Sequence, residues 1–169
     1  MSYTENDLPE ESAIARTSPN NTLHLLAGSN LRYYYYSTDG GLTWAAAPLA
    51  SSFGVWGDPC VVVDTNDNYY FFHLSHPAAG SPPTPGSWID RIVCQKLTAF
   101  GETWSDGSHT GLNGTKAQDK EWAVVDRTNN RIHVTWTQVD TFPAPAGITY
   151  WTELVDSGWS NVFYRAGSS

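Results

Sequence analysis

The sequence predicts an all-β fold made of three consecutive four-stranded antiparallel meanders. Aromatic residues make up 14% of the 169 residues, with eight Trp and nine Tyr, and they occur in short runs separated by Gly and Pro. Runs of this composition are typical of strands between tight turns. No long window shows the 3.6-residue apolar period of an amphipathic helix. A third observation is an internal repeat, since the same order of strands and turns occurs three times.

Each repeat contains three predicted strands and a Trp near the start of a fourth. A short apolar run ends at a turn rich in Asn, Asp and Thr, and a second strand follows that turn. The marker residues Trp44, Trp104 and Trp159 lie 60 and 55 residues apart, which suits one four-stranded unit with loops of variable length. The predicted strands are 12–16, 23–27 and 32–36, then 60–64, 69–74 and 91–97, then 123–126, 132–137 and 148–151, each set followed by a strand at or just after its marker Trp.

Residues 37–44, with the sequence STDGGLTW, predict the tight turn between the last two strands of the first repeat. Asp39 can accept hydrogen bonds from backbone N–H groups two or three residues on, and a glycine after it can adopt φ > 0 without a Cβ penalty. The hydroxyls of Ser37 and Thr43 can lock the turn. We expect Trp44 to bury a large surface beneath it.

This S-x-D-x-G-x-T-W pattern resembles the Asp-box, or BNR repeat, of the sialidase superfamily. In that family the box caps outer hairpins of β-propeller blades, on the face opposite the active site. Residues 57–64 and 119–126 also look like blade openings of bacterial exo-sialidase-like proteins, and the likeness extends over about residues 10–165. The second and third boxes are degraded. The five defining positions of the intact box are Ser37, Asp39, Gly41, Thr43 and Trp44.

The resemblance implies one Asp-box propeller domain over residues 1–169, with blades at about 10–50, 51–111 and 112–169. Sialidases have six blades, so the predicted fold is half of a six-bladed sialidase-like propeller. Bare blade faces would expose apolar surface, and we expect a homodimer that completes a six-bladed ring. A fragment of a longer sialidase-like chain is the alternative. The bare end faces are expected to belong to the blade that contains Leu23, Leu25 and residues 33–36 at one end, and to the blade that contains Ile132, Val134 and Trp136 at the other.

Charge and composition restrict the partners. The formal net charge is −8 with a pI near 4.8, which argues against nucleic-acid binding because that usually needs a basic face. The sequence contains no apolar run of 18 residues, so no membrane span is predicted, and the first residues lack the pattern of a signal peptide. The family resemblance implies a secreted or cell-surface location. Cys60 and Cys94 fall on non-adjacent predicted strands, too far apart for a disulfide.

Carboxylates recur near the expected propeller axis, at the start of each repeat. Asp58, Asp119 and Glu121 are the candidate catalytic residues, with Glu10 and Glu11 at the corresponding place in the first repeat. Such groups can act as an acid/base pair for glycosidic bond cleavage or as a cation site. The favoured interpretation is that they accept backbone N–H bonds in the connecting turns. No metal site or cofactor is assigned, with calcium as the alternative. Residues 64–68 predict a hairpin turn and not a calcium loop.

The candidate ligand-binding residues lie in loops of the same face. Exposed Trp can stack on sugar rings, whereas packing onto the sheet ends is the ordinary alternative. His76 and His109 are expected to be solvated loop residues. The sialidase clamp of three Arg is not supported, because the F/Y-R-I-P motif is absent. The candidates are Trp56, Trp88, Trp122, Arg32 and Arg91.

The sequence therefore favours a glycan-binding or scaffolding module that lacks the full catalytic set. An exo-α-sialidase-type glycoside hydrolase is one alternative, and a structural subunit of an extracellular assembly is another. Whether the chain is an enzyme stays open, and the missing Arg clamp argues against it.

Overall fold

The computed structural model describes residues 15–29, 32–75, 89–98, 100, 103–110, 117–139, 148–155 and 165–166. These residues form strands and no helix, in three four-stranded antiparallel sheets, which confirms the predicted all-β fold of three meanders. We call the sheets blades 1, 2 and 3. Their strands are β1 (Ala15–Thr17), β2 (Leu25–Gly28), β3 (Tyr33–Ser37) and β4 (Ala45–Pro48); β5 (Cys60–Val63), β6 (Tyr69–Leu74), β7 (Ile92–Leu97) and β8 (Ser108–Thr110); β9 (Ala117–Asp126), β10 (Arg131–Val139), β11 (Ile148–Val155) and β12 (Arg165–Ala166).

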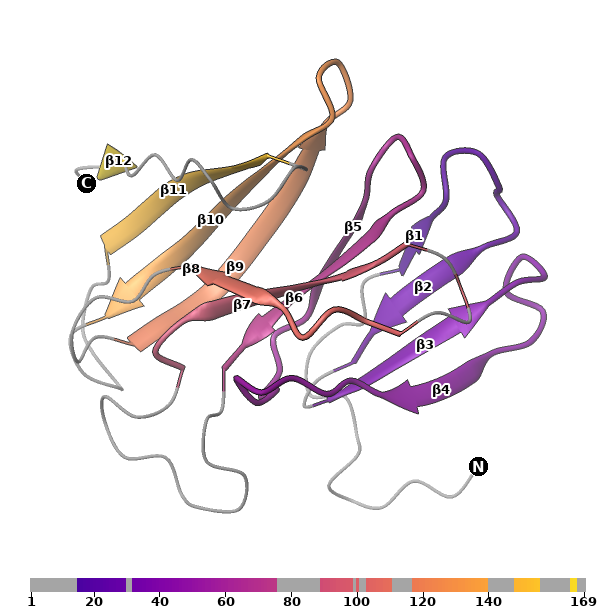
Figure 1. Cartoon of the computed structure of the whole chain (residues 1–169), viewed down its shortest axis with the longest axis horizontal. Helices are drawn as coiled ribbons and strands as arrows, with labels where there is room; N and C mark the ends of the chain where they lie inside the picture. The colour runs from indigo at the N-terminus through magenta and orange to yellow at the C-terminus, as the bar shows by residue number, and fades with distance from the viewer. Residues whose placement is uncertain are drawn as a thin grey trace.

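Within each blade the strands follow one another in chain order, so every hairpin joins two neighbours. Blade 2 lies between blades 1 and 3 (Figure 1). The first strands of the blades come together, because β5 contacts both β1 and β9. This places the first strands innermost, next to the line where a propeller has its axis. No helix that could span a membrane occurs in the described part of the chain.

Blades 1 and 2 meet through an apolar core. From blade 1, Leu26 is buried against blade 2, and Tyr34 and Tyr36 pack on the same cluster. Blade 2 contributes the face that carries Val61 and Phe71. Because successive side chains of a strand point to opposite faces, the neighbours of these residues belong to the other side of the sheet.

Blades 2 and 3 meet through the other face of blade 2. This face carries Cys60 and Val62 of β5, followed by buried residues of β6 and β7. From blade 3 it meets Ala123 together with Ile132, Val134 and Trp136, all fully buried. Blade 2 is thus covered on both faces, and its four β5 and six β6 residues are all buried. We call the side of a blade that meets the following blade its leading face, and the side that meets the preceding blade its trailing face.

The bare end faces belong to blades 1 and 3, and the structure shows which side chains each of them carries. Ile132, Val134 and Trp136 point inward to blade 2, and so do Tyr34 and Tyr36. The two-residue period shows which side chains share a face but does not show which face the next blade covers. The leading face of blade 3 instead carries Trp122, Val124, His133 and Thr135, and the trailing face of blade 1 carries Leu25, Ala27, Tyr33 and Tyr35. Leu23 lies in the β1–β2 turn and is exposed.

The turn over residues 37–44 has the hydrogen bonds that its sequence predicts. The Ser37 hydroxyl donates to Asp39 Oδ1 at 2.7 Å and accepts the Gly41 N–H at 2.9 Å. Asp39 accepts the Thr43 N–H at 2.9 Å and the Thr43 hydroxyl at 2.6 Å, four residues on, and it also has a backbone hydrogen bond with Leu42, three residues on as expected. These bonds, led by that of the Thr43 hydroxyl, lower the pKa of Asp39 to about 2. Gly41 has φ of 89°, as expected.

Trp44 is less buried than expected. Its side chain is 36% exposed, and its indole N–H donates to the Gly41 carbonyl at 3.0 Å. The ring therefore covers the turn from outside the main cores, since the turn stands beyond the end of the sheet. The cysteine prediction is confirmed: Cys60 and Cys94 pair with opposite sides of Phe72 on the intervening strand, and both are buried thiols that form no disulfide. Burial raises the pKa of the Cys94 thiol.

Candidate functional site at the openings of the inner strands

Blade 3 opens with an irregularity in its inner strand. On β9 and β10, Trp122 pairs with Thr135 and Asp119 pairs with Thr137. Between these two pairs β9 advances by three residues, whereas β10 advances by two. This is a β-bulge, and Lys120 within it has a positive φ of 54°. Bulges re-aim side chains at the ends of strands and are frequent beside functional sites.

Blade 2 opens in the same way. Cys60 pairs with Phe72, and the next contact of the ladder is the Leu74 N–H donating to the Gly57 carbonyl at 3.1 Å. The first strand again advances by three residues, from Gly57 to Cys60, while β6 advances by two, and Asp58 has a positive φ of 51°. Counted from the bulges, Asp58 and Lys120 hold equivalent positions in consecutive blades.

These equivalent residues form an ion pair. Lys120 Nζ donates to Asp58 Oδ2 at 2.7 Å, which links the opening of β9 to the opening of β5. Asp119 Oδ1 accepts the Lys120 N–H at 2.9 Å and thereby supports the left-handed backbone of the bulge. Lys120 is exposed, whereas Asp58 and Asp119 are half-buried. Because the pair is open to solvent on one side, its main contribution is the position of the charges and not stability.

Glu121 lies behind this pair and is 5% exposed. Neither of its carboxyl oxygens has a hydrogen-bond partner among the described residues. Burial raises the pKa of Glu121 well above its usual range, and the charges of Asp58 and Asp119 raise it further, while Lys120 opposes them. The sequence-predicted carboxylates Asp58, Asp119 and Glu121 therefore do lie together. One of them is a closed-off carboxyl that favours the neutral form.

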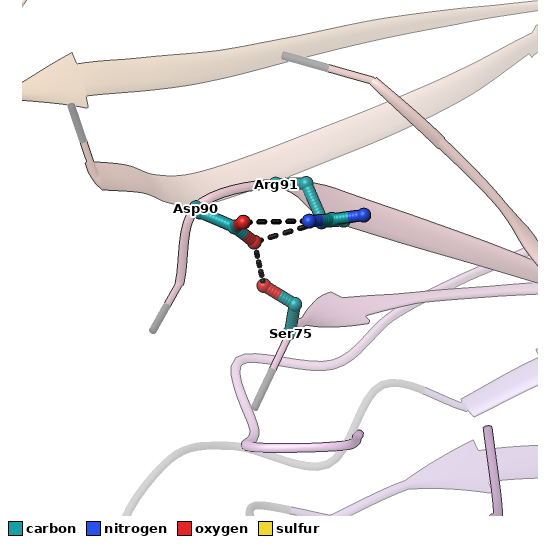
Figure 2. Close-up of polar contacts among 3 residues, drawn as sticks. All are labelled: Ser75, Asp90 and Arg91. Atoms are coloured by element: carbon teal, nitrogen blue, oxygen red, sulfur yellow. Dashed lines mark hydrogen bonds and ion pairs between the residues drawn. The ribbon is translucent and has the colours of Figure 1, made fainter. Parts of the chain in front are cut away.

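A second polar group lies at the start of β7 (Figure 2). Asp90 accepts two hydrogen bonds from Arg91, Nε to Oδ1 at 2.8 Å and Nη2 to Oδ2 at 2.6 Å, and a third from the Ser75 hydroxyl at 2.9 Å. Burial by itself would raise the pKa of Asp90, but these bonds outweigh it and lower the pKa. The Arg91 guanidinium also lies 5.3 Å from the centre of the Phe53 ring. Two of its donors are thus committed to Asp90 within the chain.

The other candidate ligand residues are dispersed. Trp56 is half-buried and packs on the core between blades 2 and 3, so it has the ordinary packing role. Trp122 is half exposed, and Arg32 is exposed. His109 is half-buried with its ring edge-on to Phe53, and burial followed by the charge of Arg91 lowers its pKa. Trp88, His76, Glu10 and Glu11 lie outside the described residues.

The predicted hairpin turn at residues 64–68 is confirmed. Asp64 is buried and accepts the N–H groups of Asn66 and Asn68 at 2.8 and 2.9 Å, so its oxygens serve the turn. Within the described ranges no group of three or more His, Cys, Asp or Glu side chains could hold a metal ion.

Sequence reasoning missed the pairing of Lys120 with Asp58. The signal was present, because the blade openings 57–59 and 119–121 align and place opposite charges at one position. It also missed a row of buried polar groups beside the site. The Trp136 indole N–H donates to Gln118 Oε1 at 2.8 Å, and Gln118 Nε2 donates to Gln138 Oε1 at 3.4 Å. Gln and Trp at alternate strand positions carry no pattern that distinguishes such a row from ordinary strand residues.

The three packed meanders, with inner strands in contact and a polar site at their openings, define blades of a β-propeller. No family model and no curated protein matches the chain. Among solved structures, an α-L-arabinanase of Penicillium chrysogenum complexed with arabinobiose matches with a TM-score of 0.65 at 12% identity. The match covers 98% of this chain and 52% of the arabinanase, so this chain spans about half the length of that protein.

At this identity the likeness establishes the fold alone. The arabinanase is a five-bladed β-propeller, and nothing in the match is specific to sialidases. The propeller fold expected from the sequence is therefore confirmed, while the sialidase family and its Asp-box stay a resemblance.

Proposed function

We propose that this chain is a glycan-binding β-propeller module whose ligand lies over the openings of β5 and β9. The observation that carries the proposal is the Asp58–Lys120 pair, held at equivalent bulges by two blades with Asp119 beside it. Carboxylates accept hydrogen bonds from sugar hydroxyls, and the ammonium donates to them. The similarity to a propeller structure that holds arabinobiose supports a glycan-related role.

Binding is favoured over hydrolysis because of Glu121. A glycosidase needs two carboxyl groups that reach the glycosidic bond, one of them protonated. Glu121 is the carboxyl with the raised pKa, yet both of its oxygens are closed off from solvent. Arg91, which a sialidase-like clamp would require, has two donors committed to Asp90. The site therefore presents groups that hold a sugar more readily than groups that cleave one.

A glycoside hydrolase is the second candidate, and one observation favours it. A neutral carboxyl beside two further carboxylates is the combination from which acid/base pairs are built. In that case Glu121 would be the general acid and would have to become accessible when substrate binds. A stacking role for Trp122 and a location outside the cell stay predictions.

The test separates binding from turnover. The chain is applied to an array of neutral and acidic oligosaccharides, and any ligand found is titrated by calorimetry. The same oligosaccharides are then assayed for release of reducing ends. We expect binding without turnover, and about tenfold or greater weakening in Lys120→Met, since a charge-assisted hydrogen bond contributes about 1.5–3 kcal/mol.

Arg127→Met is the matched control, because Arg127 is also an exposed cation but lies in the β9–β10 turn at the other end of the inner strand. It should bind as the unmodified chain does. Absence of any glycan ligand would overturn the proposal. Turnover that disappears in Glu121→Gln while binding persists would replace it with the hydrolase.

A further inference from the structure

The two interfaces between blades within the chain repeat one geometry. In blade 2, Cys60 and Val62 of β5 pair with Phe72 and Tyr70 of β6 on the leading face. The register of blade 3 places Trp122, Val124, Thr135 and His133 at the four corresponding positions, in that order. The leading face of blade 3 is therefore built on the same positions as a face that another blade covers.

Exposure is where the two faces differ. Cys60 and Val62 are 1% and 3% exposed, because blade 3 lies over them. Trp122 and Val124 are each 51% exposed, although Trp is the largest side chain and Val an apolar strand residue. Exposed Trp and Val side by side on a sheet face are the kind of apolar patch that marks an interaction site.

The trailing face of blade 1 is the complementary surface. Leu25 and Ala27 hold the positions of Tyr69 and Phe71 in blade 2, since they pair in the same register with the first strand. Tyr69 and Phe71 are buried against blade 1, whereas Leu25 of blade 1 is half-buried and has Tyr33 and Tyr35 on the same face. Neither end face carries a fixed charge among these residues, so bringing the two together would bury no unpaired charge.

The turns at the far end of the blades supply a second strip of contact. The Asn20 N–H donates to Asp67 Oδ1 at 3.2 Å, which joins the inner turn of blade 1 to that of blade 2. The Thr65 N–H donates to Asn130 Oδ1 at 2.9 Å, which joins the turn of blade 2 to that of blade 3. Each interface between blades thus combines an apolar sheet contact with a hydrogen bond between turns.

We propose that the leading face of blade 3 binds the trailing face of blade 1 in a second copy of this chain. The occupant is a second copy because the register of this face fits the trailing face of a blade of this type, and the chain itself carries such a face on blade 1. The contact is head-to-tail, and its smallest closed form contains two copies. The proposed sugar-holding pair of Asp58 and Lys120 is complete within one copy and does not need this contact, whereas the contact would cover Trp122 and so compete with a stacking role for it.

The test measures mass by light scattering and native mass spectrometry over a wide range of protein concentration. The expected species has twice the chain mass of 18.6 kDa. Val124→Lys should convert it to a single chain, because it places a charge in the centre of the contact. Val124 is already half exposed in one copy, so the substitution leaves the blade folded, which far-ultraviolet circular dichroism checks.

Leu42→Lys is the matched control, since Leu42 is 86% exposed in the outer turn and belongs to neither face. It should retain the dimer, and Tyr35→Lys on the opposite face should lose it. A stable single-chain species of the unmodified protein would overturn the proposal, as would a dimer that survives both face variants. A ladder of larger species would overturn closure at two copies. Glycan binding by monomeric Val124→Lys separates this inference from the proposed function.

Discussion

Glu121→Gln should remove a dependence of stability on pH. In the unfolded chain the Glu121 carboxyl titrates near its ordinary pKa of 4.5, whereas burial holds its folded pKa well above that. Between these two values the folded state holds a proton that the unfolded state has released. Stability is therefore complete below about pH 4.5 and falls as the pH rises toward the folded pKa, by up to about 1.4 kcal/mol for each pH unit.

The magnitude follows from what surrounds the carboxyl. Its oxygens have no hydrogen-bond partner among the described residues, so an amide of the same shape loses no bond that the acid makes. We expect equal free energies of unfolding for both proteins near pH 4. Near pH 7 the Gln variant should be the more stable by the accumulated cost of the buried charge. In a domain of this size each kcal/mol corresponds to a rise of about 2–4 °C in Tm.

The assay is urea unfolding at a series of pH values, followed by fluorescence of the Trp residues. Asp119→Asn is the control, because Asp119 is half-buried and raises the pKa of Glu121 only through its charge. It should reduce the pH dependence without abolishing it. If Glu121→Gln keeps the full pH dependence, or is less stable at every pH, then the carboxyl is charged and paired in the folded state, and the account of this site is wrong.

Three further outcomes are expected. Trp44→Ala should lower the free energy of unfolding in urea by about 2–3 kcal/mol, which is below the range for a fully buried Trp because the ring is 36% exposed. Glycan binding should be unchanged, and lost binding with unaltered stability would contradict the structural role of Trp44. Gly107→Ala should destabilise the chain, since Gly107 has φ of 106° and an added Cβ would lie 2.8 Å from Val93 Cγ1, and an unchanged melting temperature would show that the β7–β8 connection relaxes freely. A fluorogenic sialoside should not be cleaved between about pH 4 and 8, because two donors of Arg91 are held by Asp90, and measurable release of the fluorophore would refute this.

The strand order could be predicted because its signals are local. The side-chain hydrogen bonds of the turn at residues 37–44 join residues four or fewer apart, so Ser37, Asp39 and Thr43 specify them in the sequence itself. The faces of the blades could not be predicted, since alternation groups Ile132 with Val134 but leaves open which neighbour they meet. Trp44 could not be placed for a similar reason. Its large apolar side chain suggests burial, but its exposure depends on where the turn lies relative to the core.

The site was predicted in its members but not in their roles. Asp58, Asp119 and Glu121 stand at the blade openings in the sequence, and the structure brings them together. Their division into an ion-paired residue, a bulge-supporting residue and a closed-off acid depends on the irregular backbone just before β5 and on the bulge in β9. A bulge changes the direction in which each following side chain points, and the residue types at 57–59 and 119–121 do not by themselves predict a bulge.

The position of blade 2 between its neighbours has a consequence for how the fold opens. In the described part of the chain the apolar cores join blade 2 to blade 1 and blade 2 to blade 3, so stability is carried by couplings between neighbouring blades, as in a repeat array. Blade 2 shares two such couplings, and its β5–β6 turn is bonded to the turns on both sides through Asn20 and Asn130. The amide hydrogens of β6 should therefore exchange with solvent only when the whole chain unfolds, whereas those of β3 and β10 can exchange when an end blade detaches and rejoins. Deuterium uptake by peptides would then show the chain fraying from its two outer sheets while its middle one stays protected.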